Sequence, residues 1–281
     1  MSRLINSPES DDTTRELLRS QRATEAGDRM KSIVLPTLSF VGFILIWHFA
    51  VVYFDLPVYI LPRPLSIFPE IARRPEMFLR HAWVTLFETL AGLGLSIATG
   101  VILAFMIVWS DNMEKMLMPF IVLSQTFPKT AIAPLMIIWF GYGYLPKIII
   151  SFLIAFFPIV INTVLGLKSP KSDMIDLMRS MSATKAQVFA KVRIPMAVPY
   201  FFSGLKIGIT LALVGAVVGE FVGADSGLGF LIMAANNQFN TRLAFATLFV
   251  LMILGAFLYF IAEFLERRVA PWFEASRRTD K

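Results

Sequence analysis

The 281-residue chain is 56% hydrophobic and 16% charged, and its mean hydropathy is +0.67. A soluble chain is about 45–50% apolar, so this composition indicates an integral membrane protein. Cysteine is absent, which excludes disulfides, Cys-ligated zinc and thiol catalysis. The only histidines, His48 and His81, have no second ligand at a helical spacing, so no metal site is expected. The net charge of +6 raises the question of which loops carry the cations.

Apolar runs long enough to cross the hydrocarbon core, about 20 residues, predict an all-α membrane protein with six transmembrane helices. The expected spans are 32–54, 83–109, 116–140, 145–168, 197–224 and 243–265. The polar segment 1–31 is too long and too acidic for the charged end of a signal peptide, so we expect it to remain as a tail, with a second tail over 267–281. The proline-rich segment after the first span predicts a short helix at the membrane surface.

Lysine and arginine are distributed unevenly between the two sets of loops. With the N-terminus in the cytoplasm, eighteen of them lie in cytoplasmic segments and six, including Lys147, in outside segments, while Lys129 and Lys206 fall within spans. Because cytoplasmic loops carry an excess of these residues, we expect both termini in the cytoplasm. The segment 169–196, between the fourth and fifth spans, is then cytoplasmic as well.

The second and fifth spans carry small residues at helical spacing, which lets helix backbones approach each other in lipid. The second span has one row, formed by Gly92, Ser96 and Gly100. The fifth span has two rows, formed by Gly204, Gly208, Ala212 and Ala216 and by Gly215, Gly219 and Gly223. Two rows predict a helix that contacts neighbours on more than one side, at the centre of a bundle or at a subunit interface. A well-packed interior helix with no further role fits the same pattern.

The third span contains several prolines, so we expect two half-spans that meet near residues 127–129. Backbone groups freed inside the membrane need protein or water as partners, which would place Gln125, Thr126 and Lys129 beside a polar cavity. In the alternative interpretation, neighbouring helices close the kink and Lys129 extends to the interface.

Two further polar residues fall within spans. Asn162 lies in the fourth span, and Glu220 lies near the outer end of the fifth. An acid at this depth is usually functional or paired, although one at the end of a span can also be solvated. Both residues are candidates for lining a polar pathway.

The segment 169–196 reads as two short amphipathic helices. Ser169 and Pro170 predict a helix start, and the apolar stripe that follows consists of Met174, Leu177, Met178 and Met181. After a turn near Ser182, Thr184 and Gln187 have the spacing of a capping box. We expect Pro195 to end the second helix and Pro199 to begin the next span. A loop held against a membrane at both ends could hardly reach a DNA groove, so lipid association and protein docking remain open.

This segment resembles the cytoplasmic coupling loop of ABC importer permease subunits. In that family's pattern, Asp176, Leu177 and Met178 occupy the Glu-Ala-Ala positions, Ser182 the glycine, Val192 a hydrophobic position, and Ile194 with Pro195 the Leu-Pro. The stretches "AIAPLMIIWFGYG", "FFPIVINTVLGLKS" and "VPYFFSGLKIGITLALVGAVVGEFVGADSGLGFLI" resemble permeases of the nitrate, sulfonate, taurine and bicarbonate group, which includes importers of thiamine-precursor pyrimidines. The resemblance covers about residues 35–270.

The resemblance implies a type I, MetI-like permease fold in a bacterial inner membrane. It implies two cytoplasmic ATPase subunits, a second permease copy that forms a homodimer, and an extracytoplasmic solute-binding protein. The segment 171–195, including Ala183, is expected to dock the ATPase, with Gln125, Thr126, Lys129, Asn162 and Glu220 as candidates for the translocation pathway. The chain has no phosphate-binding loop, so ATP and Mg²⁺ are expected on the partner and no catalytic or cofactor-binding residue in this chain.

Two other classes of membrane protein would leave different patterns in the sequence. An ion-coupled secondary carrier predicts paired broken helices and acids at the middle of the membrane, and an intramembrane enzyme needs a nucleophile with a base. The sequence has neither pattern. Apolar and aromatic residues dominate the third and fourth spans, which favours a small neutral or aromatic solute over a bare inorganic anion, while the family also implies sulfonate-like, nitrate-like or taurine-like substrates.

Overall fold

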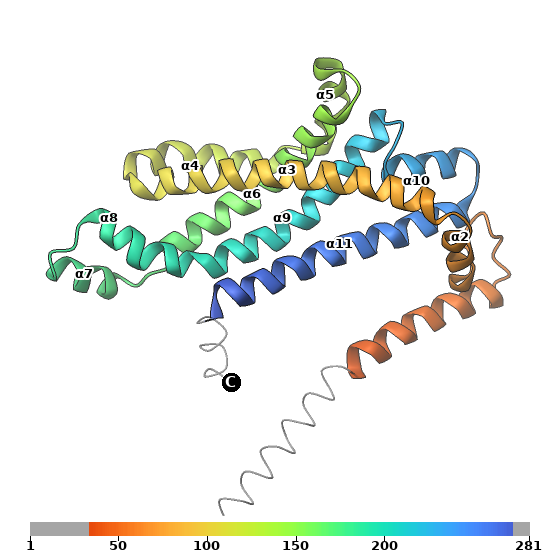
Figure 1. Ribbon diagram of the computed structural model, residues 1–281, viewed down its shortest axis with the longest axis horizontal. Helices are drawn as coiled ribbons and strands as arrows, with labels where there is room; N and C mark the ends of the chain where they lie inside the picture. Colours follow the sequence, from red (N-terminus) through yellow and green to blue (C-terminus); the bar gives the residue numbers. More distant parts are fainter. Residues whose placement is uncertain (1–33, 272–281) are drawn as a thin grey trace, which may run out of the picture. The chain divides into compact units, whose positions relative to one another are not determined.

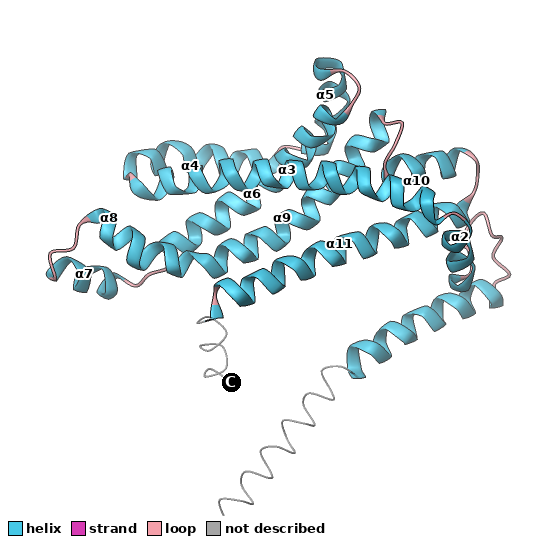
Figure 2. Cartoon of the chain, in the orientation of Figure 1, coloured by secondary structure: helices cyan, strands magenta, loops and turns pink. Residues whose placement is uncertain are grey.

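The computed structural model describes residues 34–271 and divides into two units, residues 1–66 and 67–281, which are described separately. The tail predicted over 1–31, and residues 272–281 of the other predicted tail, lie outside the described residues. Every regular element in the described part is a helix (Figure 2). A helix satisfies its own backbone hydrogen bonds, which is the condition for crossing lipid.

The described part of the first unit contains a helix at the position of the first predicted span. It covers Val34–Tyr53, is 20 residues long and has a mean hydropathy of 2.0. The chain leaves this helix through Asp55, which has a positive φ of 46°. A short 3₁₀ turn, η1 (Pro64–Ser66), follows, and the Ser66 hydroxyl donates to the carbonyl of Arg63 at 2.7 Å.

The second unit contains the remaining helices (Figure 1). They are α2 (Ile67–Arg73), α3 (Pro75–Trp109), α4 (Asp111–Thr126), η2 (Lys129–Ile132), α5 (Ala133–Phe140), α6 (Tyr144–Lys168), α7 (Ser172–Ser180), α8 (Lys185–Val188), η3 (Phe189–Arg193), α9 (Ile194–Gly223), α10 (Leu228–Asn237) and α11 (Thr241–Val269). Figure 1 shows α3, α6, α9 and α11 running alongside one another, with α7 and α8 at one end of this bundle and α10 at the other.

Each of the six expected spans coincides with a long apolar helix or a bent pair of helices. The first is Val34–Tyr53, and α3, α6, α9 and α11 are long and apolar enough to cross a membrane. The pair formed by α4 and η2–α5 bends by 80° between Thr126 and Lys129. The predicted break near residues 127–129 is therefore confirmed, because Pro128 ends the first half.

Two features of the helices differ from the sequence-based prediction. Helix α3 begins at Pro75, well before the predicted residue 83, because proline fits the first turn of a helix and the residues after it allow the helix to continue. Helix α10 was not predicted. It begins after Gly227, whose φ of +112° suits glycine, and it buries Leu228, Leu231 and Ile232.

Helices α6 and α9 form the closest seam of the unit. A Cβ added at Gly204 would lie 2.9 Å from the Pro158 carbonyl oxygen, and one added at Gly215 would lie 2.7 Å from Cα of Ser151. Gly208 and Gly219 approach the same helix. The two predicted rows of α9 thus merge into one seam against α6. Gly223 approaches Ile137 of α5 instead, and α9 also contacts α3, α10 and α11, so the predicted contact with neighbours on more than one side is confirmed.

The small residues of α3 pack against α6 as well, at Ser151 and Ile159. A Cβ on Gly92 would lie 2.5 Å from the Ser151 hydroxyl, and one on Gly100 would lie 3.3 Å from Ile159. Ser96 donates its hydroxyl to the Phe152 carbonyl at 3.0 Å. Helix α6 is therefore held between α3 and α9 through small residues, as expected where lipid gives no hydrophobic drive for helices to associate.

This packing predicts opposite effects for two Gly→Ala substitutions. Gly215→Ala places a methyl group against the α6 backbone, so we expect the free energy of unfolding to fall by about 1–3 kcal/mol. Gly94 has nothing within 4 Å of an added Cβ, so Gly94→Ala is expected to be neutral or to stabilise the helix by up to about 1 kcal/mol. Thermal unfolding in one detergent, followed by circular dichroism, measures both. Equal melting temperatures would contradict the seam.

Candidate functional site

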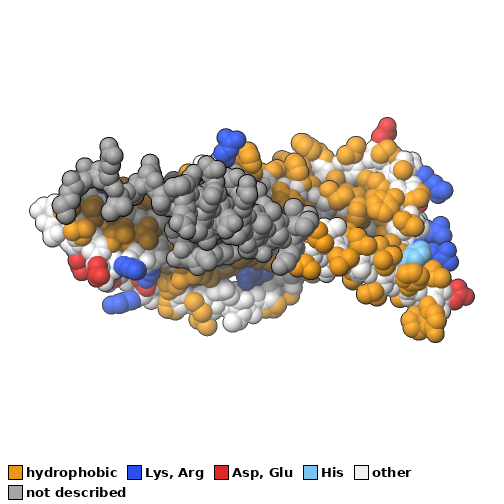
Figure 3. All heavy atoms as spheres, turned by 90° about the horizontal axis from the view of Figure 1, so that it is seen from below, with side chains coloured by type: hydrophobic (Ala, Val, Ile, Leu, Met, Phe, Trp, Pro, Cys, Tyr) orange, Lys and Arg blue, Asp and Glu red, His pale blue; other side chains and the backbone are white. Residues whose placement is uncertain are grey.

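Helix α7 presents an uncovered apolar stripe at one end of the bundle. Met174, Leu177 and Met181 are 43%, 62% and 72% exposed, respectively. Lys, Arg, Asp and Glu side chains gather along the lower side of the left end in Figure 3. Exposed apolar residues inside a polar border are typical of a protein or membrane contact. Among the predicted coupling residues, Asp176 and Leu177 are exposed and Met178 is partly buried.

Helix α7 begins later than predicted. Its first residue is Ser172 and its N-cap is Lys171, whereas Ser169 and Pro170 were expected to start it. Ser169 instead ends α6, and its hydroxyl donates to the carbonyl of Gly166 at 2.8 Å. The serine is thus used to satisfy a free carbonyl at the end of one helix, and Pro170 lies in the connection between the two.

The turn after α7 explains why the family pattern has glycine at the position of Ser182. Ser182 has a φ of +61° and donates its N–H to the Arg179 carbonyl at 2.9 Å, while Ala183 donates to the Met178 carbonyl at 3.0 Å. These two bonds form a Schellman motif, whose left-handed residue is usually glycine. The predicted turn is therefore present, and a serine occupies a backbone conformation that glycine adopts at lower cost.

The second short helix begins with the predicted capping box. The Thr184 N–H donates to the Gln187 side chain at 2.8 Å, and the Gln187 N–H donates to the Thr184 hydroxyl at 3.3 Å. Both exposed backbone donors at the start of α8 are thereby satisfied. This part of the prediction is confirmed.

Pro195 does not end this helix, contrary to prediction. Helix α8 continues through the π-helical turn η3 into α9, so that Lys185–Gly223 is one helical run of 39 residues. Ile194 donates its N–H to the Phe189 carbonyl, five residues back. We attribute the continuity to this wider turn, because it gives the proline ring room beside the preceding carbonyls, which a regular α-helix lacks. Pro199 likewise lies inside α9.

The start of this long helix is fixed to the bundle on both sides. The ring of Phe189 lies 5.4 Å from the ring of Phe105 and 5.4 Å from that of Trp109, both edge-on and both on α3. Arg193 donates to the Leu167 carbonyl of α6 at 3.0 Å. Val192, a predicted coupling residue, is only 8% exposed. Val192 therefore supports the helix from inside, whereas Ile194 is exposed at 36%.

A buried polar cluster joins four helices at the other end of the bundle. Lys147 of α6 lies 3.0 Å from Glu88 of α3. Glu220 of α9 accepts hydrogen bonds from the Thr85 hydroxyl at 2.7 Å and from the Gly229 N–H of α10 at 2.5 Å. All three charged side chains are at most 3% exposed. Glycine is required at position 229, because a Cβ there would lie 2.7 Å from the Glu220 carboxylate.

The same cluster holds the connection between α9 and α10. Leu228 donates its N–H to the Thr85 hydroxyl at 2.8 Å, and Gly227 donates to Nδ1 of His81 at 3.0 Å. Helix α3 thus supplies acceptors to the backbone at the start of α10 through His81 and Thr85. These contacts satisfy groups that a helix N-terminus leaves free.

The cluster differs from what the sequence predicted. Lys147 was assigned to an outside loop, yet it is buried as the partner of Glu88. Glu220, predicted as a candidate for the pathway, is 2% exposed and bonds to residues of its own chain; its role in the pathway stays a prediction. A buried acid needs a partner, so the sequence already implied one. The sequence did not indicate which residues are the partners, because Glu88 and Lys147, like Glu220 and Thr85, are far apart along the chain.

The remaining pathway candidates lie in two places, beside the bend that follows α4 and within α6. Lys129 lines a cavity of about 340 Å³, together with Ser124, Phe127 and Phe157 among others, and its ammonium lies 4.6 Å from the centre of the Phe157 ring. Gln125 and Thr126 are exposed beside the bend. Asn162 instead donates to the Pro158 carbonyl at 2.8 Å within α6, next to Gly204.

Comparison with known proteins assigns the fold and the family. Residues 96–271 match the family described as "Binding-protein-dependent transport system inner membrane component". The formylaminopyrimidine transport permease protein of Halalkalibacterium halodurans is 37% identical over 84% of this chain and 95% of its own length. The chain is an ABC importer permease subunit of this family.

More distant relatives agree with this assignment. The permease is 29% identical to the taurine transport system permease protein of Escherichia coli, over 80% of this chain and 84% of that protein. It shares its fold with a chain of the MetNI methionine ABC transporter in inward-facing conformations, with a TM-score of 0.62 and 19% identity over 70% of this chain and 98% of that chain. The MetI-like fold and the permease family expected from the sequence are both confirmed.

The buried ion pair of the permease predicts non-additive mutational effects. Lys147→Met leaves Glu88 buried without its partner, which we expect to lower the free energy of unfolding by about 3–5 kcal/mol. Glu88→Met combined with Lys147→Met removes both charges and is expected to recover most of that loss. The control is Lys168→Met, which breaks a half-exposed pair with Glu114 and is expected to cost no more than about 1 kcal/mol. Thermal unfolding in detergent measures all three, and a loss in the double variant as large as that in Lys147→Met would be inconsistent with a buried pair.

The left-handed turn residue predicts opposite effects at two serines. Ser182→Gly relieves a conformation that costs a non-glycine residue about 1 kcal/mol, so amide exchange in α7 is expected to slow. Ser180 lies within α7 and donates to the Leu177 carbonyl, so Ser180→Gly is expected to speed exchange there by costing about 0.5–1 kcal/mol. Hydrogen–deuterium exchange of the α7 peptide measures both. Faster amide exchange in Ser182→Gly would show that the left-handed conformation of residue 182 does not limit the stability of α7.

Proposed function

We propose that this permease forms the translocation pathway of an ATP-driven importer and couples to a separate ATPase through the segment 171–195. The observation that carries the proposal is the exposed stripe of Met174, Leu177 and Met181, which one short turn joins to the unbroken helical run Lys185–Gly223 that contains the membrane helix α9. Residues of the family pattern, Asp176, Ser182 and Ala183, lie in the same segment. ATP and Mg²⁺ bind the partner, since this sequence has no phosphate-binding loop.

The complete importer has two ATPase subunits, two copies of this permease and a solute-binding protein. The family description, which names a binding-protein-dependent system, supports the last of these. The α7–α8 end faces the cytoplasm of a bacterial cell and the α10 end faces the binding protein. Lys147 is buried, so it no longer counts among the cations of the outside loops. The excess of loop cations at the α7–α8 end is therefore larger, which supports this orientation.

In this importer, closure of the ATPase dimer moves α7 and α8 as one body with α9. A helix that continues through Pro195 transmits a displacement directly, whereas a flexible connection would absorb it. Phe189 and Arg193 link its start to α3 and α6, and Glu220 links its far end to α10. Movement at the ATPase therefore reaches the outer end of the pathway, and ATP binding shifts the equilibrium between two packings of these helices.

Docking through α7 predicts loss of the complex when a charge enters the stripe. Leu177 is 62% exposed, so Leu177→Asp leaves folding intact but buries a carboxylate at the interface. We expect affinity for the ATPase to fall at least about tenfold, with loss of transport. Ser172→Asp adds the same charge on the opposite side of α7 and serves as the matched control. Co-purification with the ATPase and uptake into proteoliposomes measure both.

Retained binding and uptake in Leu177→Asp would contradict docking through this stripe. Uptake that proceeds in the absence of ATP would instead indicate an ion-coupled secondary carrier. Neither result depends on which solute is transported, provided that the purified complex shows uptake before substitution.

We further propose that the transported solute is a small aromatic heterocycle. The cavity beside the bend of α4 is lined by Phe120, Phe127 and Phe157 with Lys129 as its cation, which suits a flat ring with polar substituents. The relative named for formylaminopyrimidine transport is 37% identical, compared with 29% for the taurine permease.

Competition between solutes tests this proposal. In proteoliposomes with the cognate binding protein and ATPase, uptake of a radiolabelled aminopyrimidine is expected to exceed uptake of taurine. Phe157→Leu removes the ring that faces Lys129 and is expected to reduce aminopyrimidine uptake, while Phe260→Leu, an exposed residue of α11, serves as the control. Preferred uptake of taurine would reverse the assignment of the substrate.

A further inference from the structure

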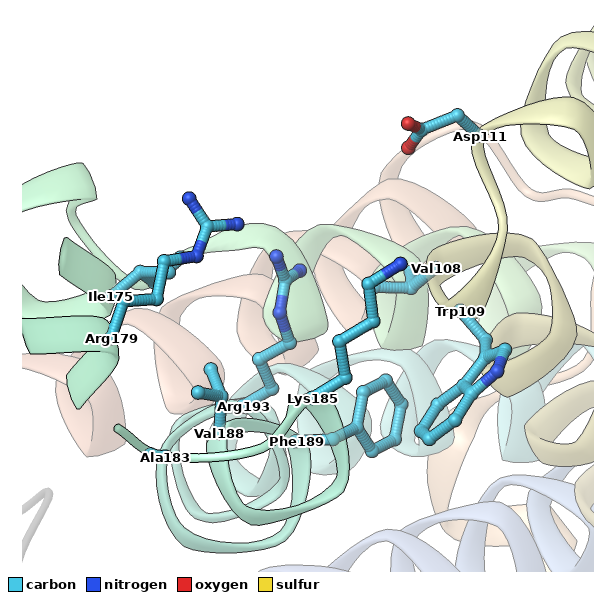
Figure 4. Close-up of a pocket in the computed structure, with 10 residues that line it drawn as sticks. All are labelled: Val108, Trp109, Asp111, Ile175, Arg179, Ala183, Lys185, Val188, Phe189 and Arg193. Carbon is cyan, nitrogen blue, oxygen red and sulfur yellow. The ribbon is translucent and has the colours of Figure 1, made fainter. Parts of the chain in front are cut away.

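A second cavity lies on the side of the α7–α8 segment that faces the bundle (Figure 4). It has a volume of about 180 Å³ and is bordered by α3, the start of α4, and the segment from α7 to η3. Its lining includes the cations Arg179, Lys185 and Arg193 and a single carboxylate, that of Asp111. Figure 4 shows the charged ends of the three cations pointing to the same side of the segment, with Asp111 across from them.

The cations are not neutralised by strong partners within residues 34–271. Arg193 donates one N–H to the Leu167 carbonyl at 3.0 Å, and a carbonyl leaves its charge unpaired. Arg179 lies 3.4 Å from Asp176, but both side chains are about two-thirds exposed, and an exposed pair of this kind contributes little. Lys185 has no ion-pair partner among the described residues. The cavity therefore retains an excess of positive charge.

The other side of the same cavity is apolar. Trp109, Phe189 and Val188 belong to the lining, and the Trp109 ring packs edge-on against Phe189. Trp109 is the last residue of the membrane helix α3 and is 53% exposed. Tryptophan at the end of a span marks the level of the lipid headgroups, so the cations lie at the depth where phospholipid phosphates lie.

We propose that this cavity binds the phosphate group of an anionic phospholipid. Basic pockets between transmembrane helices bind phospholipid headgroups, and guanidinium groups match the geometry of phosphate oxygens. The three cations bind the phosphate, and Trp109 and Phe189 contact the adjoining glycerol and acyl region. Asp111 opposes an anion and limits its affinity.

The lipid site and the ATPase stripe occupy different sides of α7. Ile175 and Arg179 line the cavity, whereas Met174, Leu177 and Met181 form the exposed stripe, on average roughly two-fifths of a turn away. A bound lipid would thus fix the inner side of the segment while its outer side stays free for the partner. The site connects the state of the membrane with the start of the long helix α9.

Lysine acetylation in lipid nanodiscs tests the proposal on the full chain. Both faces of a nanodisc are open to acetic anhydride, so the result does not depend on the orientation proposed above or on the ATPase. Lys171 and Lys191 are exposed cations of the same segment outside the cavity lining and serve as internal references. Replacing part of the phosphatidylcholine with phosphatidylglycerol is expected to slow acetylation of Lys185 about fivefold relative to these references.

Two variants with opposite expected signs separate binding from damage to the fold. Arg179→Gln removes a cation and is expected to weaken the protection of Lys185, while Asp111→Asn removes the opposing charge and is expected to strengthen it. Lys171→Gln is the matched control and leaves protection unchanged. Equal relative acetylation of Lys185 in both lipids, or equal protection in all variants, would overturn the site. Protection by inorganic phosphate in phosphatidylcholine discs that equals protection by phosphatidylglycerol would overturn the lipid as the source of the phosphate.

Discussion

The close approach of α6 and α9 is the constraint on which the rest of the second unit depends. Lipid gives helices little hydrophobic reason to associate, so contact must come from backbones that can approach each other. Gly204, Gly208, Gly215 and Gly219 make that approach possible along most of α9. At these positions a side chain larger than hydrogen on α9 would collide with α6. A movement imposed on one end of α9 must therefore either carry α6 with it or break the contact as a whole.

Polar groups fix the two ends of this seam in different ways. At the α10 end, Glu220 bonds to Thr85 and to the backbone of Gly229, while Glu88 pairs with Lys147. Removing one member of such a cluster exposes another to an apolar surrounding without a partner, so the helices are held in a specific arrangement. Farther along, Lys206 of α9 pairs with Glu266 of α11 at 2.5 Å. These pairs give the helix bundle a register that small residues alone would not specify.

The α7–α8 end is built to be contacted from outside. Its inner side is fixed by Phe189, Val192 and Arg193, and its outer side exposes methionine and leucine. Methionine is flexible and adapts to a partner surface, which fits an ATPase that changes shape during its cycle. The π-helical turn before Pro195 makes α8 and α9 one continuous helix, and the turn at Ser182 joins α7 to its start. In the proposed mechanism, docking energy acts directly on the membrane helix.

The amino-acid sequence by itself determined the class of protein, the number of spans, the break near Pro128, the capping box at Thr184 and the turn at Ser182, because each follows from hydropathy or from contacts within a few residues. It also determined the family, through the pattern around Asp176. Tertiary structure alone decided that Lys147 pairs with Glu88, that Glu220 holds α10, and that glycines of both rows of α9 face α6. These contacts join residues from separate helices, and hydropathy does not order helices in space. The continuity of the helix through Pro195 likewise depended on a wider turn, for which single-residue preferences give no signal.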